Sequence, residues 1–488
     1  MWLPCLDGRA GPRYRAITEA LAEDVAAGRL PEGERLPTHR DLANRLRVTV
    51  GTVSRAYSEA ARLGLIGGEV GRGTFVRPRG EMPGADAECL PALSRAPVPS
   101  PGVGWFAERA ARAEGDVLSG EGIDLSLNYP LPSPIGPALA AGLQGMQDED
   151  LLAAIGRYQP ANGLLRHREA GVAWLRSLGV EEDVDDVLVV PGCQGGLTIV
   201  FQALCGPGDV VLHEALTWPG LHATAASLGV RTIGLAIDAD GLMPDAFDAA
   251  CREHRPRLLY TMPTLHNPTA IVMPEERRHA VAAVARRHGV VVVEDDVYGF
   301  LLDTPPPAVR TLLPELGIYV TSISKSVAPG LRIGWLAAPS GLVPRLAAAM
   351  RRSILMTSSV AAEVATRTIF AGAAGRAAEM QREEARRRQE LAAARLAGLD
   401  FRSHPRAFHG WLRVPPPWRR DDFVAALRVR GVIVTPGTAF GESGGRGEAE
   451  THVRLCLCAV ADRERLAAAL DIVAETASGG SPSRLPDV

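Results

Sequence analysis

Short runs of β-branched residues alternate with Ala-, Leu- and Arg-rich stretches along most of this 488-residue chain. The runs have the length of buried strands, and the stretches between them have the length of helices. Strands connected through helices form a mainly parallel sheet, so the predicted fold class is α/β with a largely parallel sheet. A smaller α+β part is expected around residues 411–414 and 453–457. The runs lie at residues 187–190, 210–212, 232–237, 258–261, 290–294, 318–322 and 333–336.

A different pattern occupies the amino-terminal region. Apolar residues recur at helical spacing over residues 14–28, and Thr38 and Thr49 stand where they can cap two further short helices. Residues 71–76, with two glycines, are typical of a β-hairpin. Two short helices followed by a hairpin indicate a winged helix-turn-helix, although helix spacing alone also fits a small interaction module. Arg exceeds the acidic residues in this region, on a chain that is otherwise acidic, and this excess favours a polyanionic partner.

Composition divides the chain into four segments. We expect a winged helix-turn-helix at residues 1–78, an Ala-, Pro- and Gly-rich linker at 79–120, the α/β domain at 121–475 and a disordered tail at 476–488. A flexible linker of this length reaches roughly 35 Å, enough for the amino-terminal domain to lie over a neighbouring subunit.

Other features limit the location and the cofactors. No apolar run is long enough to span a bilayer, and the first thirty residues lack a signal core, so we expect a cytoplasmic protein without a membrane partner. Seven cysteines are scattered without a CxxC pair or metal-ligand spacing, which predicts reduced thiols and no metal site.

Lys325 is the only lysine among 53 Lys and Arg residues. A lysine ε-amine can lose its proton and add to an aldehyde as a Schiff base, whereas arginine stays protonated and unreactive. Chance survival of one lysine under a compositional bias is the alternative. The position of Lys325 directly after a predicted strand favours a chemical role.

Further polar residues follow the ends of the predicted strands, where ligand-binding groups gather along one edge of such a sheet. Asp295 can keep a heterocyclic nitrogen protonated, while Asn267 and Tyr298 can hydrogen-bond a ring oxygen. The glycine-rich turn at residues 192–196 opens a predicted helix, whose first N–H groups can hold a phosphate. Each residue alone could be a cap, a turn or a core side chain. Together they indicate one ligand, a phosphorylated pyridine aldehyde.

The motifs Asn267-Pro268, Asp295-x-x-Tyr298, Ser322-x-Ser324-Lys325 and Arg332 resemble those of the fold type I, aspartate-aminotransferase superfamily, over roughly residues 121–475. The resemblance implies pyridoxal 5'-phosphate as the cofactor, with Lys325 in the internal aldimine and Asp295 at the pyridine nitrogen. It implies that Asn267 and Tyr298 bind the ring hydroxyl and that Trp218 stacks on the ring. The residues implied around the phosphate are Cys193, Gln194, Ser322, Ser324 and Arg332.

The same resemblance implies two effector-binding residues. Arg454 matches the arginine that clamps an α-carboxylate, and Tyr158, beside the family's YxxxxG element, is expected to reach the site of the partner subunit. Cys193, Trp218 and His409 replace residues that are common in the family, and these departures leave the shape of the ligand open.

The amino-terminal motifs resemble a GntR-type winged helix: Leu36-Pro37-x-x-Arg40-x-Leu42-Ala43, Val48-Thr49-x-x-Thr52-Val53-x-x-Ala56-Tyr57 and Gly71-x-Gly73-Thr74-Phe75-Val76. Together the two halves resemble the MocR subfamily of GntR regulators. The resemblance implies a head-to-tail homodimer that binds operator DNA and senses an amino acid or related amine by aldimine exchange at Lys325. An active aminotransferase and a sensor of pyridoxal phosphate itself are the alternatives. The residues implied at the DNA are Arg40, Thr49, Thr52, Arg55, Arg72 and Thr74.

Overall fold

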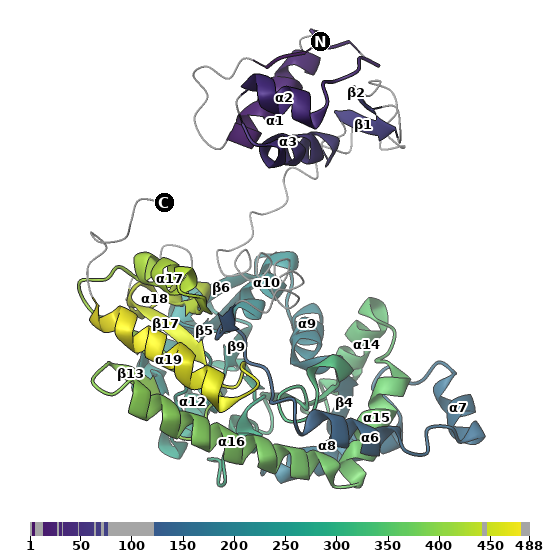
Figure 1. Ribbon diagram of the computed structural model, residues 1–488. Coiled ribbons are helices and arrows are strands. Elements are labelled where there is room, and N and C mark those ends of the chain that lie inside the picture. Colours follow the sequence, from purple (N-terminus) through teal and green to yellow (C-terminus); the bar gives the residue numbers. More distant parts are fainter. Residues whose placement is uncertain are drawn as a thin grey trace. The chain divides into compact units, whose positions relative to one another are not determined.

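The chain divides into two compact units, Met1–Pro97 and Val98–Val488 (Figure 1). The computed structural model describes residues 2–4, 13–26, 29–31, 33–46, 48–62, 65–69, 73–76, 122–441 and 447–479. The expected linker at 79–120 and the wing residue Arg72 therefore lie outside the described residues. No helix within the described ranges is both long enough and apolar enough to cross a membrane.

The smaller unit packs three helices against a two-stranded hairpin. Its elements are α1 (Arg13–Ala26), α2 (His39–Leu46), α3 (Val50–Arg62), β1 (Ile66–Glu69) and β2 (Gly73–Val76). The backbone N–H of Asp41 donates to Thr38 Oγ1, and that of Thr52 donates to Thr49 Oγ1, both at 3.2 Å, so both predicted caps form. Ile17, Leu21, Leu42, Val53 and Tyr57 form the centre of the core. The winged helix-turn-helix prediction is confirmed.

Seven strands, counted over the described residues, form the main sheet of the larger unit in the order β4-β12-β11-β10-β9-β5-β6. All neighbours are parallel except β12, which is antiparallel to β11 and to β4. The connection from β11 to β12 is too short for a helical crossover, so the chain reverses there. The strands are β4 (Val187–Val190), β5 (Val210–Glu214), β6 (Arg231–Leu235), β9 (Leu258–Thr261), β10 (Val291–Asp295), β11 (Gly317–Ser322) and β12 (Gly334–Ala337).

Helices cover both faces of this sheet. Successive residues of β10 point to opposite faces of the sheet and belong to different apolar clusters. The cluster of Val293 includes residues of α8, α9, α10 and α14, whereas the cluster of Val292 includes residues of α11, α12 and α13. The predicted α/β class with a largely parallel sheet is thus confirmed. These helices are α8 (Leu165–Ser177), α9 (Gly192–Leu204), α10 (Pro219–Ser227), α11 (Pro244–His254), α12 (Glu275–His288), α13 (Val309–Leu312) and α14 (Val343–Ser353).

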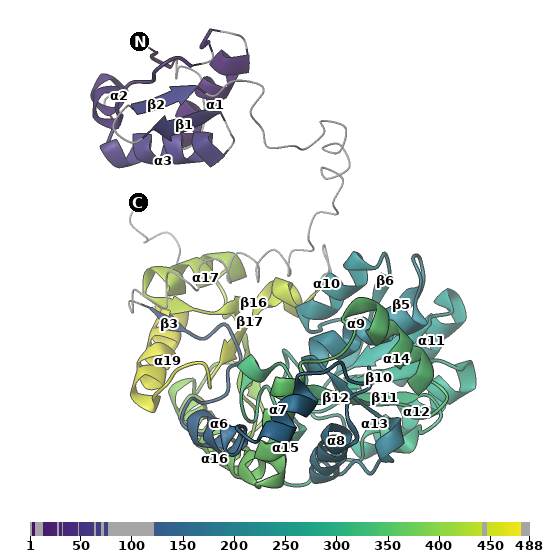
Figure 2. The ribbon, with the colours of Figure 1, turned by 90° about the vertical axis from the view of Figure 1, so that its right-hand side faces the viewer.

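A smaller carboxyl-terminal part has its own sheet, ordered β13-β14-β17-β16. Helix α16 leads into it, and α17 and α19 pack around it (Figures 1 and 2). The expected tail at 476–488 is wrong at its start, because α19 remains helical to Ser478; residues 480–488 lie outside the described ranges. The elements are α16 (Ala373–Arg395), β13 (Phe401–Ser403), β14 (His409–Arg413), α17 (Arg420–Val429), β16 (Thr435–Pro436), β17 (His452–Cys456) and α19 (Arg463–Ser478).

The first described segment of the larger unit, from residue 122 onward, returns to this smaller part. Strand β3 (Ile123–Asp124) pairs with β15 (Val432–Ile433), and the backbone N–H of Cys456 donates to the carbonyl of Leu125 at 2.8 Å. This pairing brings the residues that follow Leu125 to the junction of the two sheets.

Candidate functional site

A cavity of about 280 Å³ opens at the carboxyl ends of the central strands β9, β10 and β11. Every residue predicted to bind the cofactor lines it, and so does Arg454. The structure thus brings together residues separated by more than 250 positions in the sequence. The lining residues are Cys193, Gln194, Trp218, Asn267, Asp295, Tyr298, Ser322, Ser324, Lys325, Arg332 and Arg454, joined by Leu127, Asn128, Tyr129, Met262, Val297 and Pro329.

Lys325 lies in the turn that follows β11. Its Nζ donates to the backbone carbonyl of Asn128, which holds the amine at the cavity. Burial lowers the pKa of Lys325 to about 8. Roughly a tenth of this amine is therefore uncharged at pH 7, far more than for an ordinary lysine, and the uncharged amine is the form that adds to a carbonyl.

Asp295, the last residue of β10, is only 4% exposed. Its Oδ2 accepts a hydrogen bond from the Tyr260 hydroxyl at 2.8 Å, but its Oδ1 is buried without a hydrogen-bond partner. Burial raises the pKa of Asp295 to about 6. A protonated ring nitrogen would supply both the missing donor and the positive charge. This end of the cavity therefore fits a pyridinium ring.

The Asp295 pKa predicts a pH-dependent effect in the cofactor-free protein. Because the folded pKa of about 6 exceeds the ordinary value of 3.8, the ionised side chain destabilises the fold above about pH 6 and has no such effect below about pH 4. We expect Asp295→Asn to raise the free energy of unfolding by on the order of 2–3 kcal/mol at pH 7.5, with the gain disappearing towards pH 4. Denaturant unfolding at both pH values measures this. A gain independent of pH would contradict the assignment, and with pyridoxal phosphate present the substitution should instead destabilise.

The opposite end of the cavity is suited to an anion. Gly192 begins α9 with a φ of +73°, and a Cβ there would lie 2.8 Å from Nη2 of Arg332. Glycine is thus required for the Arg332 guanidinium to approach the start of the helix, where free N–H groups and the helix dipole attract negative charge. Arg332 forms no ion pair with any described residue. Ser322 and Ser324 add hydroxyl groups at the same edge.

Arg454 on β17 is a buried cation, 3% exposed. One guanidinium nitrogen donates to Asn267 Oδ1 at 2.6 Å and another to the carbonyl of Ser126 at 2.5 Å, while Nε is buried without a partner. The guanidinium carbon lies 4.7 Å from the centre of the Phe440 ring. Over the described ranges no carboxylate pairs with it. Burying a guanidinium without an anion is costly, so the site favours a ligand that supplies a carboxylate.

Sequence reasoning missed Asn128, which no motif marked. Its Nδ2 lies 2.8 Å from the Tyr298 hydroxyl and 2.9 Å from His409 Nδ1. Asn128 reaches the cavity only because its segment pairs with the smaller sheet. His409 was notable as a departure from the family, but the sequence assigned it no role.

Tyr158 does not reach the cavity of its own chain. It follows α7 (Glu149–Ile155), is 87% exposed and lines a shallow depression with Met356. Its predicted contact with the site of a partner subunit remains a prediction.

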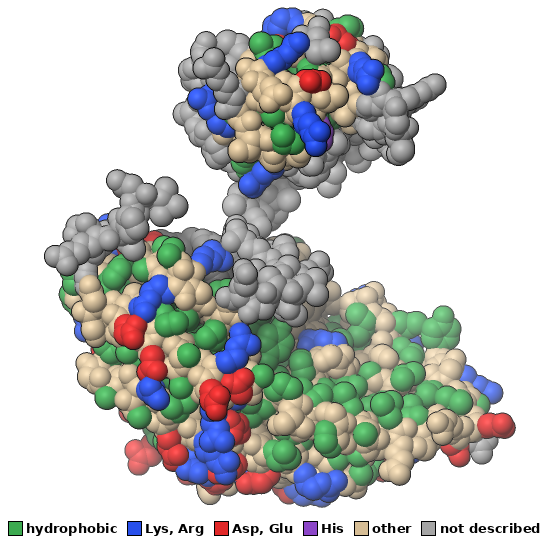
Figure 3. Space-filling model, viewed as in Figure 1, with side chains coloured by type: hydrophobic (Ala, Val, Ile, Leu, Met, Phe, Trp, Pro, Cys, Tyr) green, Lys and Arg blue, Asp and Glu red, His purple; other side chains and the backbone are tan. Residues whose placement is uncertain are grey.

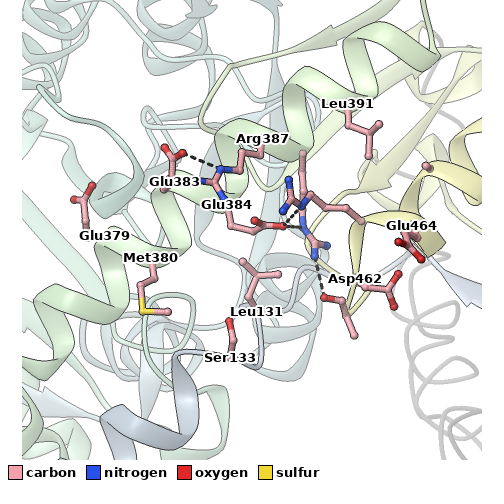
Figure 4. Close-up of a pocket in the computed structure, with 14 residues that line it drawn as sticks. Leu131, Ser133, Glu379, Met380, Glu383, Glu384, Arg387, Leu391, Asp462 and Glu464 are labelled. Carbon is pink, nitrogen blue, oxygen red and sulfur yellow. Dashed lines mark hydrogen bonds and ion pairs between the residues drawn. The ribbon is translucent and has the colours of Figure 1, made fainter.

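A larger open groove, of about 1030 Å³, lies along α16 beside the start of α19 (Figure 4). Most of its charged groups are already paired: Arg387 contacts Glu383 and Arg388 contacts Glu384, both at 2.9 Å. Asp462 Oδ1 accepts from the backbone N–H of Arg465 and caps α19. Since none of these groups is left for a ligand, we place the functional site in the smaller cavity.

In the smaller unit, Arg40, Thr49 and Arg55 are exposed, whereas Thr52 and Thr74 are half-buried. Basic side chains outnumber acidic ones on the face of this unit seen in Figure 3. The Arg55 guanidinium lies 4.1 Å above the Tyr14 ring, and the hydroxyls of Thr49 and Thr52 are 2.9 Å apart. The threonine pair lies at the start of α3, and the Arg55–Tyr14 contact joins the second turn of α3 to α1. Helix α3 is the one that a winged helix-turn-helix inserts into the major groove.

Arg40 provides a test of the DNA surface. If it contacts a phosphate, Arg40→Ala should weaken binding to all sequences alike and reduce the dependence of log K on log salt by about one. Binding titrations at several salt concentrations measure both effects. Arg29 is already paired with Asp24 at 2.7 Å, so Arg29→Ala is the matched control. An unchanged salt slope in Arg40→Ala would remove Arg40 from the interface.

The two units define a DNA-binding domain joined to a domain with the fold of pyridoxal-phosphate aminotransferases. The family model of bacterial regulatory proteins, gntR family, matches residues 13–76, and that of aminotransferase class I and II matches residues 122–473. The chain belongs to the aminotransferase class I and II family and carries a GntR-type domain ahead of it, which implies DNA binding. It is a GntR-type transcriptional regulator with an aminotransferase-like domain, the organisation of MocR-type regulators.

Relatives share both halves. The uncharacterized HTH-type transcriptional regulator YdeF of Bacillus subtilis is 29% identical over 472 residues, covering 97% of this chain and 96% of that protein. TauR of Rhodobacter capsulatus, also an HTH-type transcriptional regulator, is 27% identical over a match that covers 89% of this chain and 90% of TauR.

Solved structures show the fold of the larger unit. An archaeal alanine:glyoxylate aminotransferase superposes with a TM-score of 0.69 at 21% identity, covering 78% of this chain and 95% of that one. Aspartate aminotransferase from Thermus thermophilus with maleate gives 0.66 at 24% identity, covering 81% and 100%.

Proposed function

We propose that the larger unit binds pyridoxal 5'-phosphate at Lys325 and senses an amine that carries a carboxylate, and that this binding changes the affinity of the winged helix for operator DNA. The observation that carries the proposal is one cavity that combines an amine of lowered pKa with a buried arginine lacking an anion, Lys325 and Arg454.

The residues of the cavity divide between cofactor and effector. Asp295 would hold the ring nitrogen, Asn267 and Tyr298 the ring oxygen, and Trp218 a ring face. The start of α9, with Ser322, Ser324 and Arg332, would hold the phosphate. Bound pyridoxal phosphate supplies an aldehyde that condenses with primary amines.

Once those residues serve the cofactor, Arg454 is the remaining cation of the cavity, and it is free to pair with one carboxylate of an effector. An effector amine would compete with Lys325 for that aldehyde, and the Lys325 amine would then be free in the cavity. Regulation then requires that the conformations with Lys325 bound and Lys325 free differ in their affinity for DNA.

The proposal includes a homodimer. Leu152 on α7, Tyr158 and Val360 on α15 (Ser359–Phe370) are exposed apolar side chains, and Figure 3 shows hydrophobic side chains gathered over this side of the larger unit. Such a surface is typical of a protein interface. We expect Val360→Asp to shift the sedimenting species from dimer to monomer. The control is Arg286→Asp, a charge change on α12, which packs on the other face of the main sheet from α15. A wild-type monomer would remove the dimer from the proposal.

Catalytic transamination is the second candidate. The pKa of Lys325, lowered to about 8, suits a group that accepts and returns a proton near neutral pH. A sensor of pyridoxal phosphate alone would use the same residues without Arg454.

One experiment separates these functions. The purified protein, loaded with pyridoxal phosphate, is titrated against the DNA upstream of its own gene, with and without a panel of amino acids and amines. Specific binding that one compound changes supports the regulator. Consumption of an amino acid with a keto acid, without specific DNA binding, would replace it by an enzyme. A response to pyridoxal phosphate alone would identify the cofactor as the signal.

A further inference from the structure

The side chain of His409, on β14, is fully buried and links the smaller sheet to two segments beside the cavity. Its Nε2 lies 3.0 Å from the backbone carbonyl of His266, and its Nδ1 lies 2.9 Å from Asn128 Nδ2. Because a carbonyl oxygen can only accept, the ring hydrogen resides on Nε2 and Nδ1 is left as an acceptor. Burial, with the nearby charge of Arg454, lowers the pKa of His409 to about 3, so the ring is neutral.

Because His409 Nδ1 is an acceptor, the Asn128 amide must turn its NH2 group, and not its oxygen, towards the histidine. One amide hydrogen of Asn128 points to His409, and the other points to the Tyr298 hydroxyl oxygen at 2.8 Å. Asn128 Oδ1 is then left buried without a partner. A reversed amide would let Oδ1 accept the Tyr298 hydrogen, but it would put the amide nitrogen in the buried position without a partner and would face His409 Nδ1 with a second acceptor. The observed orientation is therefore imposed by the histidine.

The orientation has a consequence for Tyr298. Its oxygen already accepts from Asn128, so its own hydrogen is available to a ligand in the cavity that both residues line. The backbone of His409 is held as well, since its carbonyl accepts from Ser403 Oγ at 2.8 Å and from Gln389 Nε2 at 3.2 Å.

We propose that His409 is a positioning residue: by fixing the Asn128 amide it directs the Tyr298 hydroxyl hydrogen into the cavity, towards the ring oxygen of bound pyridoxal phosphate. This inference rests on the proposed function, because it needs the cofactor in place.

Two substitutions at one position separate the two bonds of the ring. In His409→Asn, the new side-chain oxygen can lie near the position of the histidine Nδ1 and remain an acceptor for Asn128. In His409→Gln, the new amide nitrogen can lie near the position of the histidine Nε2, so that only the bond to the His266 carbonyl is kept. The measurement is the pH midpoint of the visible absorbance of the protein loaded with pyridoxal phosphate. A donor to the ring oxygen stabilises its anionic form, so loss of the donor raises the midpoint.

We expect His409→Gln to raise the midpoint by about one pH unit, the equivalent of one hydrogen bond, and His409→Asn to leave it within about 0.3 unit. Equal shifts in the two loaded variants, or no shift in either, would overturn the inference and leave the proposed function standing. A wild-type protein that binds no pyridoxal phosphate would overturn both.

Substitutions of Asn128 give an independent test with His409 in place, should the histidine variants fail to fold. Asn128→Asp offers Tyr298 a carboxylate that takes its hydrogen, so the midpoint should rise by at least one unit. Asn128→Leu offers no acceptor, and the Tyr298 hydrogen should stay directed to the cofactor with an unchanged midpoint. The same midpoint in both Asn128 variants would contradict the role given to the amide.

Discussion

Replacing Lys325 by alanine is expected to abolish covalent retention of pyridoxal phosphate altogether. After reduction with borohydride, the wild-type protein should carry the phosphopyridoxyl group on the peptide that contains Lys325, and the variant should carry none. The chain has no other lysine, so its only other amine is the α-amino group, which mass spectrometry of the peptides distinguishes.

The matched variant is Lys325→Arg, which keeps the positive charge but cannot condense with an aldehyde. Both variants should bind DNA measurably, because the winged helix forms its own core and contains no residue of the cavity. Retention of the group in either variant would place the chemistry elsewhere. Loss of DNA binding together with the cofactor would show that the two units do not work separately.

The fold and the chemistry of the site could be predicted to different extents. Continuous apolar runs identified the strands, because burial on both faces of the sheet leaves no polar position, and helical spacing identified the helices of the smaller unit. The cofactor residues could be predicted because they follow strand ends, where the parallel arrangement gathers them. The antiparallel β12 was not foreseen, since a short apolar run is the same in either direction.

Asn128 and its bonds to Tyr298 and His409 lay beyond sequence reasoning for a different reason. Asn128 precedes Tyr298 by 170 positions and His409 by 281, and their contact depends on a strand pairing that no local pattern encodes. Similarly, the paired charges of Arg387 and Arg388 look no different in sequence from unpaired ones. The tertiary fold alone shows that Arg454 has no carboxylate partner among the described residues, whereas Arg387 and Arg388 on α16 each have one.

Arg454→Ala is expected to weaken the response to a carboxylated effector by roughly thirtyfold or more while pyridoxal phosphate remains bound. Truncating one partner of a buried, hydrogen-bonded charge pair costs about 2–5 kcal/mol, and the effector carboxylate would supply that pair. The measurement is the effector concentration needed for half-maximal change in DNA binding. An amine of the same skeleton without the carboxylate should lose little or nothing.

The choice of control follows from the contacts of the guanidinium. Arg454 also donates to Asn267 and Ser126, so alanine removes these bonds along with the charge. Arg454→Gln keeps a donor and loses the charge, so a similar loss in both variants would assign the effect to the charge. Lysine is unsuitable, because a second amine beside the aldehyde could compete with Lys325. An effector response that survives in the glutamine variant would mean that the carboxylate binds elsewhere, and would leave Arg454 with only its hydrogen bonds to Asn267 and Ser126.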